Sequence, residues 1–110
     1  MNITTTLRDD GVAVLAVEGR INLVSAPDLR RAVQSAVDDG SARVAVDLSA
    51  VEFIDSSGLG ALISGLKTAR TAGGDLRLAA ATEQVTSVLQ LTNLDRILRV
   101  YPSPDDAYRD

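Results

Sequence analysis

The sequence contains no cysteine and no histidine. Without cysteine the chain can form no disulfide, thiol nucleophile or thiolate metal site, which is compatible with a reducing compartment. Without histidine it cannot assemble a serine–histidine–aspartate triad. Its acidic residues include isolated pairs such as Asp9-Asp10 and Asp38-Asp39, which are typical of solvated turns rather than of metal sites. We therefore predict a protein that is not an enzyme and that has no metal or cofactor of its own.

Aromatic residues are also scarce, since the chain has one phenylalanine, two tyrosines and no tryptophan. This leaves almost no platform for stacking on nucleic-acid bases. The formal net charge of −4 argues against nucleic acid and anionic membranes as direct partners, because both select basic surfaces. The sequence shows no apolar run near the about 18 residues that a membrane span needs, and no signal-peptide pattern. We expect a cytoplasmic protein without membrane insertion, whose partners are other proteins.

What the sequence does contain is typical of a single folded domain. Its 110 residues are 45% hydrophobic and 24% charged, which lies well outside the composition of disordered chains. A chain of this length can bury one core without disulfides or metals. We find no linker, repeat or low-complexity tract, and we predict one domain over residues 1–110.

The order of the predicted elements indicates an α/β fold. Residues 3–7 and 12–17 are rich in β-branched residues and flank a turn with Gly11, which predicts an antiparallel hairpin. Ser25 followed by Asp28 resembles a capping box at the start of a helix. The remaining elements are expected to be that helix over 26–37, a strand over 43–48, a helix over 57–72, a strand over 76–80, a helix after Thr82 that ends near Asn93, and a strand over 97–101. This order predicts a mixed sheet with helices packed on it.

Residues 55–60, Asp-Ser-Ser-Gly-Leu-Gly, form the most informative segment. A strand that gives way here to a helix would present the Ser56 and Ser57 hydroxyls at the positive end of that helix, where a phosphate or carboxylate is favoured. The simpler interpretation is an ordinary helix cap, because serine and aspartate are preferred at that position. Both interpretations are open on local chemistry alone.

The helix that follows has an unusual second face. Its core side is expected to contain Leu59, Leu62, Ile63 and Leu66. The opposite side has only small or uncharged residues: Ser57, Ala61, Ser64, Gly65 and Thr68. Such a face can dock a partner closely, or it can lie under another helix of the same domain. The sequence does not decide between the two.

Residues 53–62, Phe-Ile-Asp-Ser-Ser-Gly-Leu-Gly-Ala-Leu, resemble the signature of the STAS domain, the fold of bacterial anti-sigma factor antagonists. Further segments resemble successive blocks of that family in order, namely Gly19-Arg20-Ile21-Asn22, Gly73-Gly74 and Leu91-Thr92-Asn93-Leu94. The resemblance covers nearly the whole chain and implies a single STAS-like domain.

The resemblance implies a regulatory function. An anti-sigma factor antagonist binds an anti-sigma factor, which is often also a serine kinase, and so frees a sigma factor for transcription. Phosphorylation of Ser56 by that kinase would release the complex, and a serine phosphatase would reset it. The expected partner-binding residues are Asn22, Asp55, Ser56, Ser57, Gly58, Ala61, Ser64 and Gly65. Asn22 stands where many members have an acidic residue, which affects the expected recognition by a kinase.

Two other functions fit the same resemblance or the same segment. One is a structural STAS subunit, in a cytoplasmic signalling assembly or on a membrane transporter complex, with Ser56 acting only as a cap. The other is a small-ligand module that holds an anion at the N–H groups of Ser56 and Ser57.

Overall fold

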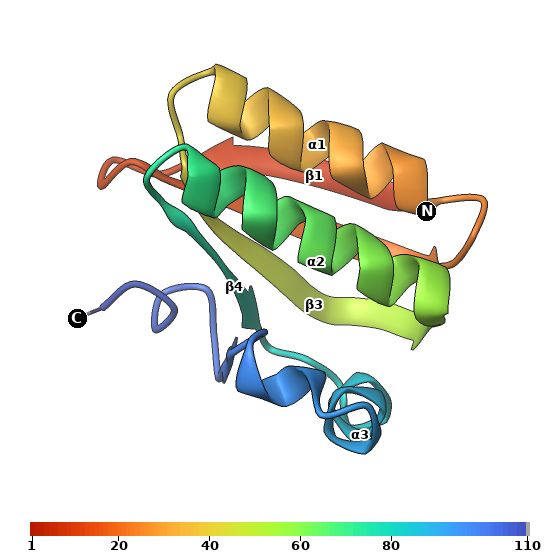
Figure 1. Cartoon of the computed structure of the whole chain (residues 1–110). Helices are drawn as coiled ribbons and strands as arrows, with labels where there is room; N and C mark the ends of the chain where they lie inside the picture. Colours follow the sequence, from red (N-terminus) through yellow and green to blue (C-terminus); the bar gives the residue numbers. More distant parts are fainter. Residues whose placement is uncertain (110) are drawn as a thin grey trace.

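A computed structural model describes residues 1–109 (Figure 1). Strands and helices alternate after an initial hairpin, as the sequence predicts. The elements are β1 (Asn2–Leu7), β2 (Val12–Ile21), α1 (Ala26–Asp38), β3 (Arg43–Ile54), α2 (Ser56–Thr71), β4 (Asp75–Ala79), α3 (Glu83–Leu91), the 3-10 turn η1 (Leu94–Arg96) and β5 (Val100–Tyr101).

The five strands form one mixed sheet in the order β1-β2-β3-β4-β5. β1 pairs antiparallel with β2, which confirms the hairpin, and Gly11 in its turn has a φ of +85° that glycine adopts readily. The other pairs are parallel, so β2, β3 and β4 all end at the same edge of the sheet. The segments that follow these strands, including residues 55–60, therefore gather at that edge.

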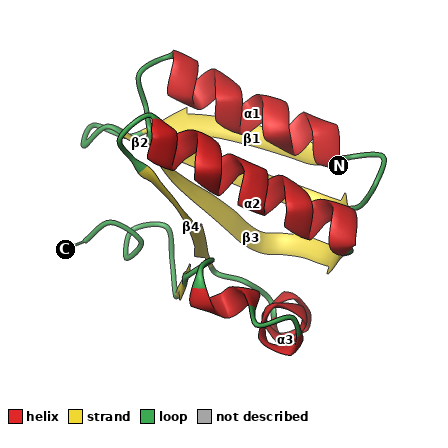
Figure 2. Ribbon diagram, in the orientation of Figure 1, coloured by secondary structure: helices red, strands yellow, loops and turns green. Residues whose placement is uncertain are grey.

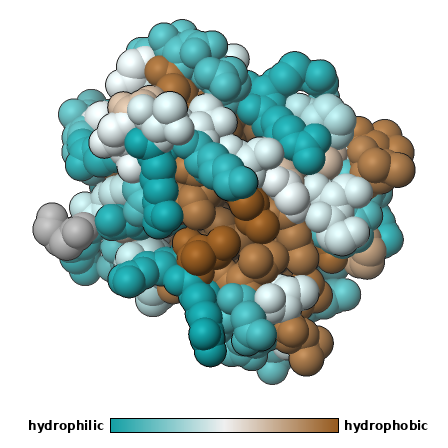
Figure 3. All heavy atoms as spheres, viewed as in Figure 1, coloured by the Kyte–Doolittle hydropathy of each residue, from teal (hydrophilic) through white to brown (hydrophobic). Residues whose placement is uncertain are grey.

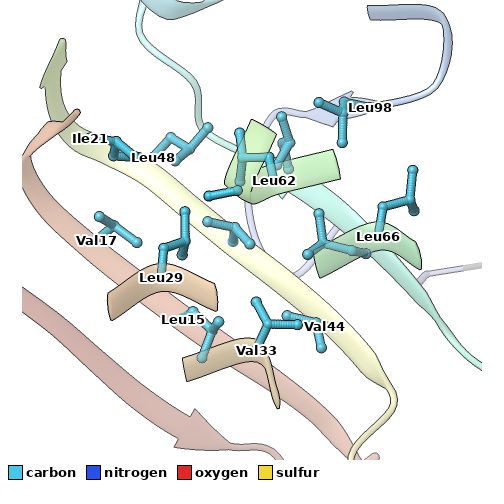
Figure 4. Close-up of a cluster of buried hydrophobic side chains, with 14 of the residues drawn as sticks. Leu15, Val17, Ile21, Leu29, Val33, Val44, Leu48, Leu62, Leu66 and Leu98 are labelled. Carbon is cyan, nitrogen blue, oxygen red and sulfur yellow. The ribbon is translucent and has the colours of Figure 1, made fainter. Parts of the chain in front are cut away.

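Helices α1 and α2 cover one face of the sheet (Figure 2). Their buried side chains and those of the central strands form a cluster, part of which is labelled in Figure 4: Leu15, Val17, Ile21, Leu29, Val33, Val44, Leu48, Leu62, Leu66 and Leu98. Val85 and Leu89 of α3 are fully buried in the same cluster. Each fully buried side chain of this kind contributes about 1.5–3 kcal/mol, so the aliphatic core compensates for the scarcity of aromatic residues.

Helix ends follow the local sequence. Gly40 has a φ of +96° just after α1 and lets the chain turn back. The Thr82 side chain accepts a hydrogen bond of 3.3 Å from the Val85 N–H and caps α3. Asn93, near which this helix was predicted to end, adopts the left-handed conformation with φ of +60°.

Three strands differ clearly in length from the prediction. β2 continues to Ile21 rather than ending at Val17. β3 continues to Ile54 rather than ending at Leu48, and its register with β2 shifts between Ala16 and Glu18 and again after Gly19. The pairing with β2 is interrupted at Leu48 and Ser49 and resumes at Ala50, so β3 continues past the point where the alternation of apolar residues fails. The last strand is only Val100–Tyr101, because residues 97–99 belong to the turn that follows η1.

The C-terminal turn packs on part of the other face of the sheet, over Val12 of β2 and Ala45 of β3. Tyr108 lies there, and its hydroxyl is 2.8 Å from both the Val44 and the Asp75 carbonyl oxygens, between which its single proton is shared. The Arg77 guanidinium stacks on the same ring, 4.4 Å from its centroid. Burial raises the pKa of the Tyr108 hydroxyl above its ordinary value, and the nearby Asp75 carboxylate raises it further.

We expect Tyr108→Phe to lower the free energy of unfolding at pH 7 by about 0.5–1.5 kcal/mol, the net worth of one hydrogen bond. The difference should shrink above about pH 10, where tyrosine ionises in the unfolded chain while the folded protein keeps its proton. The stabilisation by Tyr108 is thus complete below about pH 10 and is lost as the pH rises further. Urea unfolding of both proteins at pH 7, 10 and 11 measures this. If the difference in the free energy of unfolding between the two proteins is the same at all three pH values, the Tyr108 hydroxyl is not buried as described.

Candidate functional site

The connection between β3 and α2 places Ser56 at the surface with its hydroxyl uncommitted. Asp55 is the N-cap of α2: its backbone is extended, and its side chain accepts a 2.9 Å hydrogen bond from the Gly58 N–H. Ser56 is the first residue of the helix and is exposed, and within residues 1–109 its hydroxyl has no hydrogen-bond partner. The interpretation of Ser56 as the helix cap is therefore wrong, since Asp55 fills that position.

The end of β2 fixes this connection in place. Ile21 pairs with Ile54, and the Asp55 N–H donates a 3.2 Å hydrogen bond to the Ile21 carbonyl oxygen. Gly58 sits directly on the same strand end, where a Cβ would lie 2.6 Å from the Ile21 oxygen and 2.7 Å from Ile54 Cγ1. The expectation that Gly58 contacts a partner is wrong, because this residue is buried at the point where α2 packs against β2.

The loop between β2 and α1 lies at the same edge and is organised by Asn22. Its side-chain oxygen accepts hydrogen bonds from the N–H groups of Val24 (3.1 Å) and Ser25 (3.2 Å). Ser25 Oγ accepts from the Asn22 N–H at 2.9 Å and lies 2.8 Å from the Arg20 carbonyl, to which it donates. The predicted capping box is wrong, because Ser25 makes no side-chain cap to α1. Asn22, predicted to contact a partner, is half-buried and shapes the loop.

The small-residue face of α2 is mostly covered by α1. Ala61 is fully buried, and a Cβ on Gly65 would lie 2.9 Å from Leu76 Cδ1 and 3.2 Å from Val33 Cγ2. The docking face predicted there is wrong for these two residues, and the alternative of a covering helix is correct. Glycine at this position lets the two helices approach closely. Ser57 and Ser64 stay half-exposed, and Ser64 lines a shallow groove between α1 and α2.

Besides the Asp55 carboxylate, the surroundings of Ser56 include positively charged and apolar groups. The first-turn N–H groups of α2 carry the positive end of the helix dipole. On α1, the Arg30 guanidinium reaches to 3.8 Å from the position that a Cβ on Gly60 would occupy, one turn beyond Ser56. Arg20 stacks on Phe53 at 4.3 Å from the ring centroid. Leu23 and Val24, two exposed apolar residues of the β2–α1 loop, lie at the same edge of the sheet, and the sequence analysis did not identify them.

Among residues 1–109, no three histidine, cysteine or acidic side chains are grouped so that they could hold a metal ion. In the same range no helix has both the length and the apolar character to cross a bilayer. The chemically available group at this site is the exposed Ser56 hydroxyl at the N-terminus of α2, which another protein can reach.

Comparison with known proteins agrees with this geometry. A family model described as the STAS domain matches residues 4–107. The chain belongs to the STAS domain family. The resemblance inferred from residues 53–62 and the predicted α/β fold are thereby confirmed.

Two similar proteins are named anti-sigma factor antagonists. This STAS protein is 36% identical to the anti-sigma-F factor antagonist RsfB of Mycobacterium tuberculosis over 109 residues, which cover 96% of this chain and 87% of RsfB. The crystal structure of an anti-sigma factor antagonist from Mycobacterium paratuberculosis has a TM-score of 0.80 at 37% identity and covers 96% of this chain and 91% of that one.

The same fold occurs in the Bacillus protein SpoIIAA, of which an unphosphorylated and a phosphorylated form are known. The unphosphorylated form has a TM-score of 0.76 at 17% identity and covers 90% of this chain and 87% of SpoIIAA. The phosphorylated form has a TM-score of 0.69 at 16% identity and covers 90% of both chains. At this identity the likeness concerns the fold alone.

Proposed function

We propose that this protein is an anti-sigma factor antagonist whose binding is switched by phosphorylation of Ser56. The unmodified protein binds an anti-sigma factor and frees a sigma factor for transcription, and the phosphorylated protein releases it. The observation that carries the proposal is the exposed Ser56 hydroxyl, which has no hydrogen-bond partner among residues 1–109, since Asp55 caps the helix. A hydroxyl that neither folding nor capping uses is available to a kinase.

Phosphorylation at this position would change binding more than folding. A phosphoserine adds about −1.5 to −2 charges and three acceptor oxygens. The N-terminus of α2 offsets part of that charge, by about 0.3–1 kcal/mol, so the fold tolerates it. In a complex that covers Ser56, the same charge would be desolvated next to the Asp55 carboxylate and would oppose association.

The proposed partners follow from this switch. The anti-sigma factor would also be the serine kinase and would supply the ATP and magnesium site. A separate serine phosphatase would restore the unmodified form. The switch would operate in the cytoplasm, where sigma factors act. The relation to RsfB supports the role as an antagonist, and the phosphorylated form of SpoIIAA provides a precedent for modification on this fold.

A phosphotransfer assay tests the proposal. Each purified anti-sigma factor from the genome that encodes this chain is incubated with it and magnesium ATP, and the products are mapped by mass spectrometry. We expect one phosphate on Ser56, none on the Ser56→Ala variant, and normal modification of Ser57→Ala. Phosphate on another residue, or on none with every factor, would refute the switch.

A further inference from the structure

Two adjacent apolar side chains protrude from the loop between β2 and α1. Leu23 is 74% exposed and Val24 is 86% exposed. In Figure 3, hydrophobic surface stands out at the right of the molecule, where Figure 1 places this loop. Single exposed apolar residues are common, but an adjacent pair that projects beyond polar surroundings points to contact with another molecule.

The loop holds this pair outward. The Asn22 side chain accepts hydrogen bonds from the Val24 and Ser25 N–H groups, and Ser25 Oγ ties the start of the loop to the Arg20 carbonyl. Both polar side chains are thus turned into the loop, while the apolar side chains point away from it. A loop ordered before binding loses little conformational freedom on association, which favours its use as a contact.

The pair lies at the same edge of the sheet as the proposed phosphorylation site. Its loop leaves β2 directly after Ile21, whose carbonyl accepts the Asp55 N–H at 3.2 Å, and Ser56 follows Asp55. Gly58 in the first turn of α2 packs on the same Ile21. Backbone contacts therefore join the two surfaces, and a partner that covers Ser56 meets the loop as well.

The small surface area of the Leu23–Val24 pair indicates which kind of contact the pair belongs to. Stable interfaces bury about 800 Å² on each partner, far more than two aliphatic side chains provide. The pair must therefore belong to a larger contact, and the surface continuous with it contains Ser56. A second copy of the chain is disfavoured by its formal net charge of −4.

We propose that Leu23 and Val24 form an apolar anchor that inserts into an apolar pocket of the same anti-sigma factor that contacts Ser56. This inference rests on the proposed function and adds to it. The anchor supplies affinity and partner selection that do not depend on modification, whereas Ser56 makes the contact conditional.

The test is isothermal titration of the double variant Leu23→Ser, Val24→Ser against whichever purified anti-sigma factor binds the unmodified protein. We expect at least a tenfold loss of affinity with an unchanged thermal midpoint, because neither side chain is buried. Leu7→Ser is the matched control: Leu7 is 64% exposed, and its partner Ala13 lies near the start of β2, at the other end of that strand. This control should bind like the unmodified protein.

Three other outcomes overturn the anchor. Equal affinity of the double variant and the unmodified protein refutes it while leaving the proposed function intact. A dimer of the unmodified protein in sedimentation, lost in the double variant, assigns the pair to a second copy instead. No binding of any anti-sigma factor by the unmodified protein removes the proposed function and the anchor together.

Discussion

Ser56→Asp is expected to bind the anti-sigma factor about 30- to 150-fold more weakly than the unmodified protein, whereas Ser56→Ala binds as tightly. The aspartate places a charge beside Asp55 on a surface that the partner desolvates, and an unpaired charge there costs about 2–3 kcal/mol. Both variants should unfold close to the midpoint of the unmodified protein. The helix cap is Asp55 and is intact in each, and an acidic residue in the first turn suits the helix dipole.

Ser35→Asp is the control for charge alone, since it adds the same charge at an exposed position toward the far end of α1. Titration calorimetry of the three variants against one anti-sigma factor separates the effects. If Ser35→Asp binds as weakly as Ser56→Asp, the loss reflects net charge and not the site. If Ser56→Asp binds like the unmodified protein, Ser56 lies outside the interface.

The sequence predicted the fold because each of its signals is local. The hairpin follows from β-branched runs around Gly11, and the left-handed Asn93 follows from a residue type that tolerates this conformation. The extra length of β3 was not visible, because Ser49 and Ala50 interrupt the apolar alternation. Only pairing with β2 across two register shifts keeps that segment in the sheet.

The local structure around the candidate site could be predicted only in part. Asp55 and Ser56 are both favoured cap residues, so propensity could not choose between them. The hydrogen bond from the Asp55 N–H to Ile21 holds Asp55 in the extended conformation that a cap requires, and this contact joins residues distant in sequence. Similarly, a stripe of small residues has the same pattern whether a partner or α1 covers it, and only the tertiary structure shows that Gly65 lies against Val33.

Gly58→Ala is expected to lower the free energy of unfolding by about 1–3 kcal/mol, the usual cost of overpacking. The new Cβ would lie 2.6 Å from the Ile21 carbonyl oxygen and 2.7 Å from Ile54 Cγ1. Ile21 is paired to β3 and cannot retreat, so the start of α2 must move away from β2. That movement would weaken the 3.2 Å hydrogen bond between Asp55 and Ile21 and displace Ser56. Binding to the anti-sigma factor should therefore fall as well.

Gly60→Ala, two residues along the same helix, isolates this contact. Its Cβ would meet only the Arg30 guanidinium, at an ordinary 3.8 Å, so the substitution should raise stability by up to about 1 kcal/mol through helix propensity alone. Gly58→Ala gains from the same propensity, and the difference between the two variants in urea unfolding reports the clash with Ile21. Two glycine-to-alanine changes in one helix turn are thus expected to change the free energy of unfolding in opposite directions. If both variants are equally stable, α2 can shift relative to β2 without lowering the free energy of unfolding. The packing of Gly58 on Ile21 would then not fix the position of Ser56.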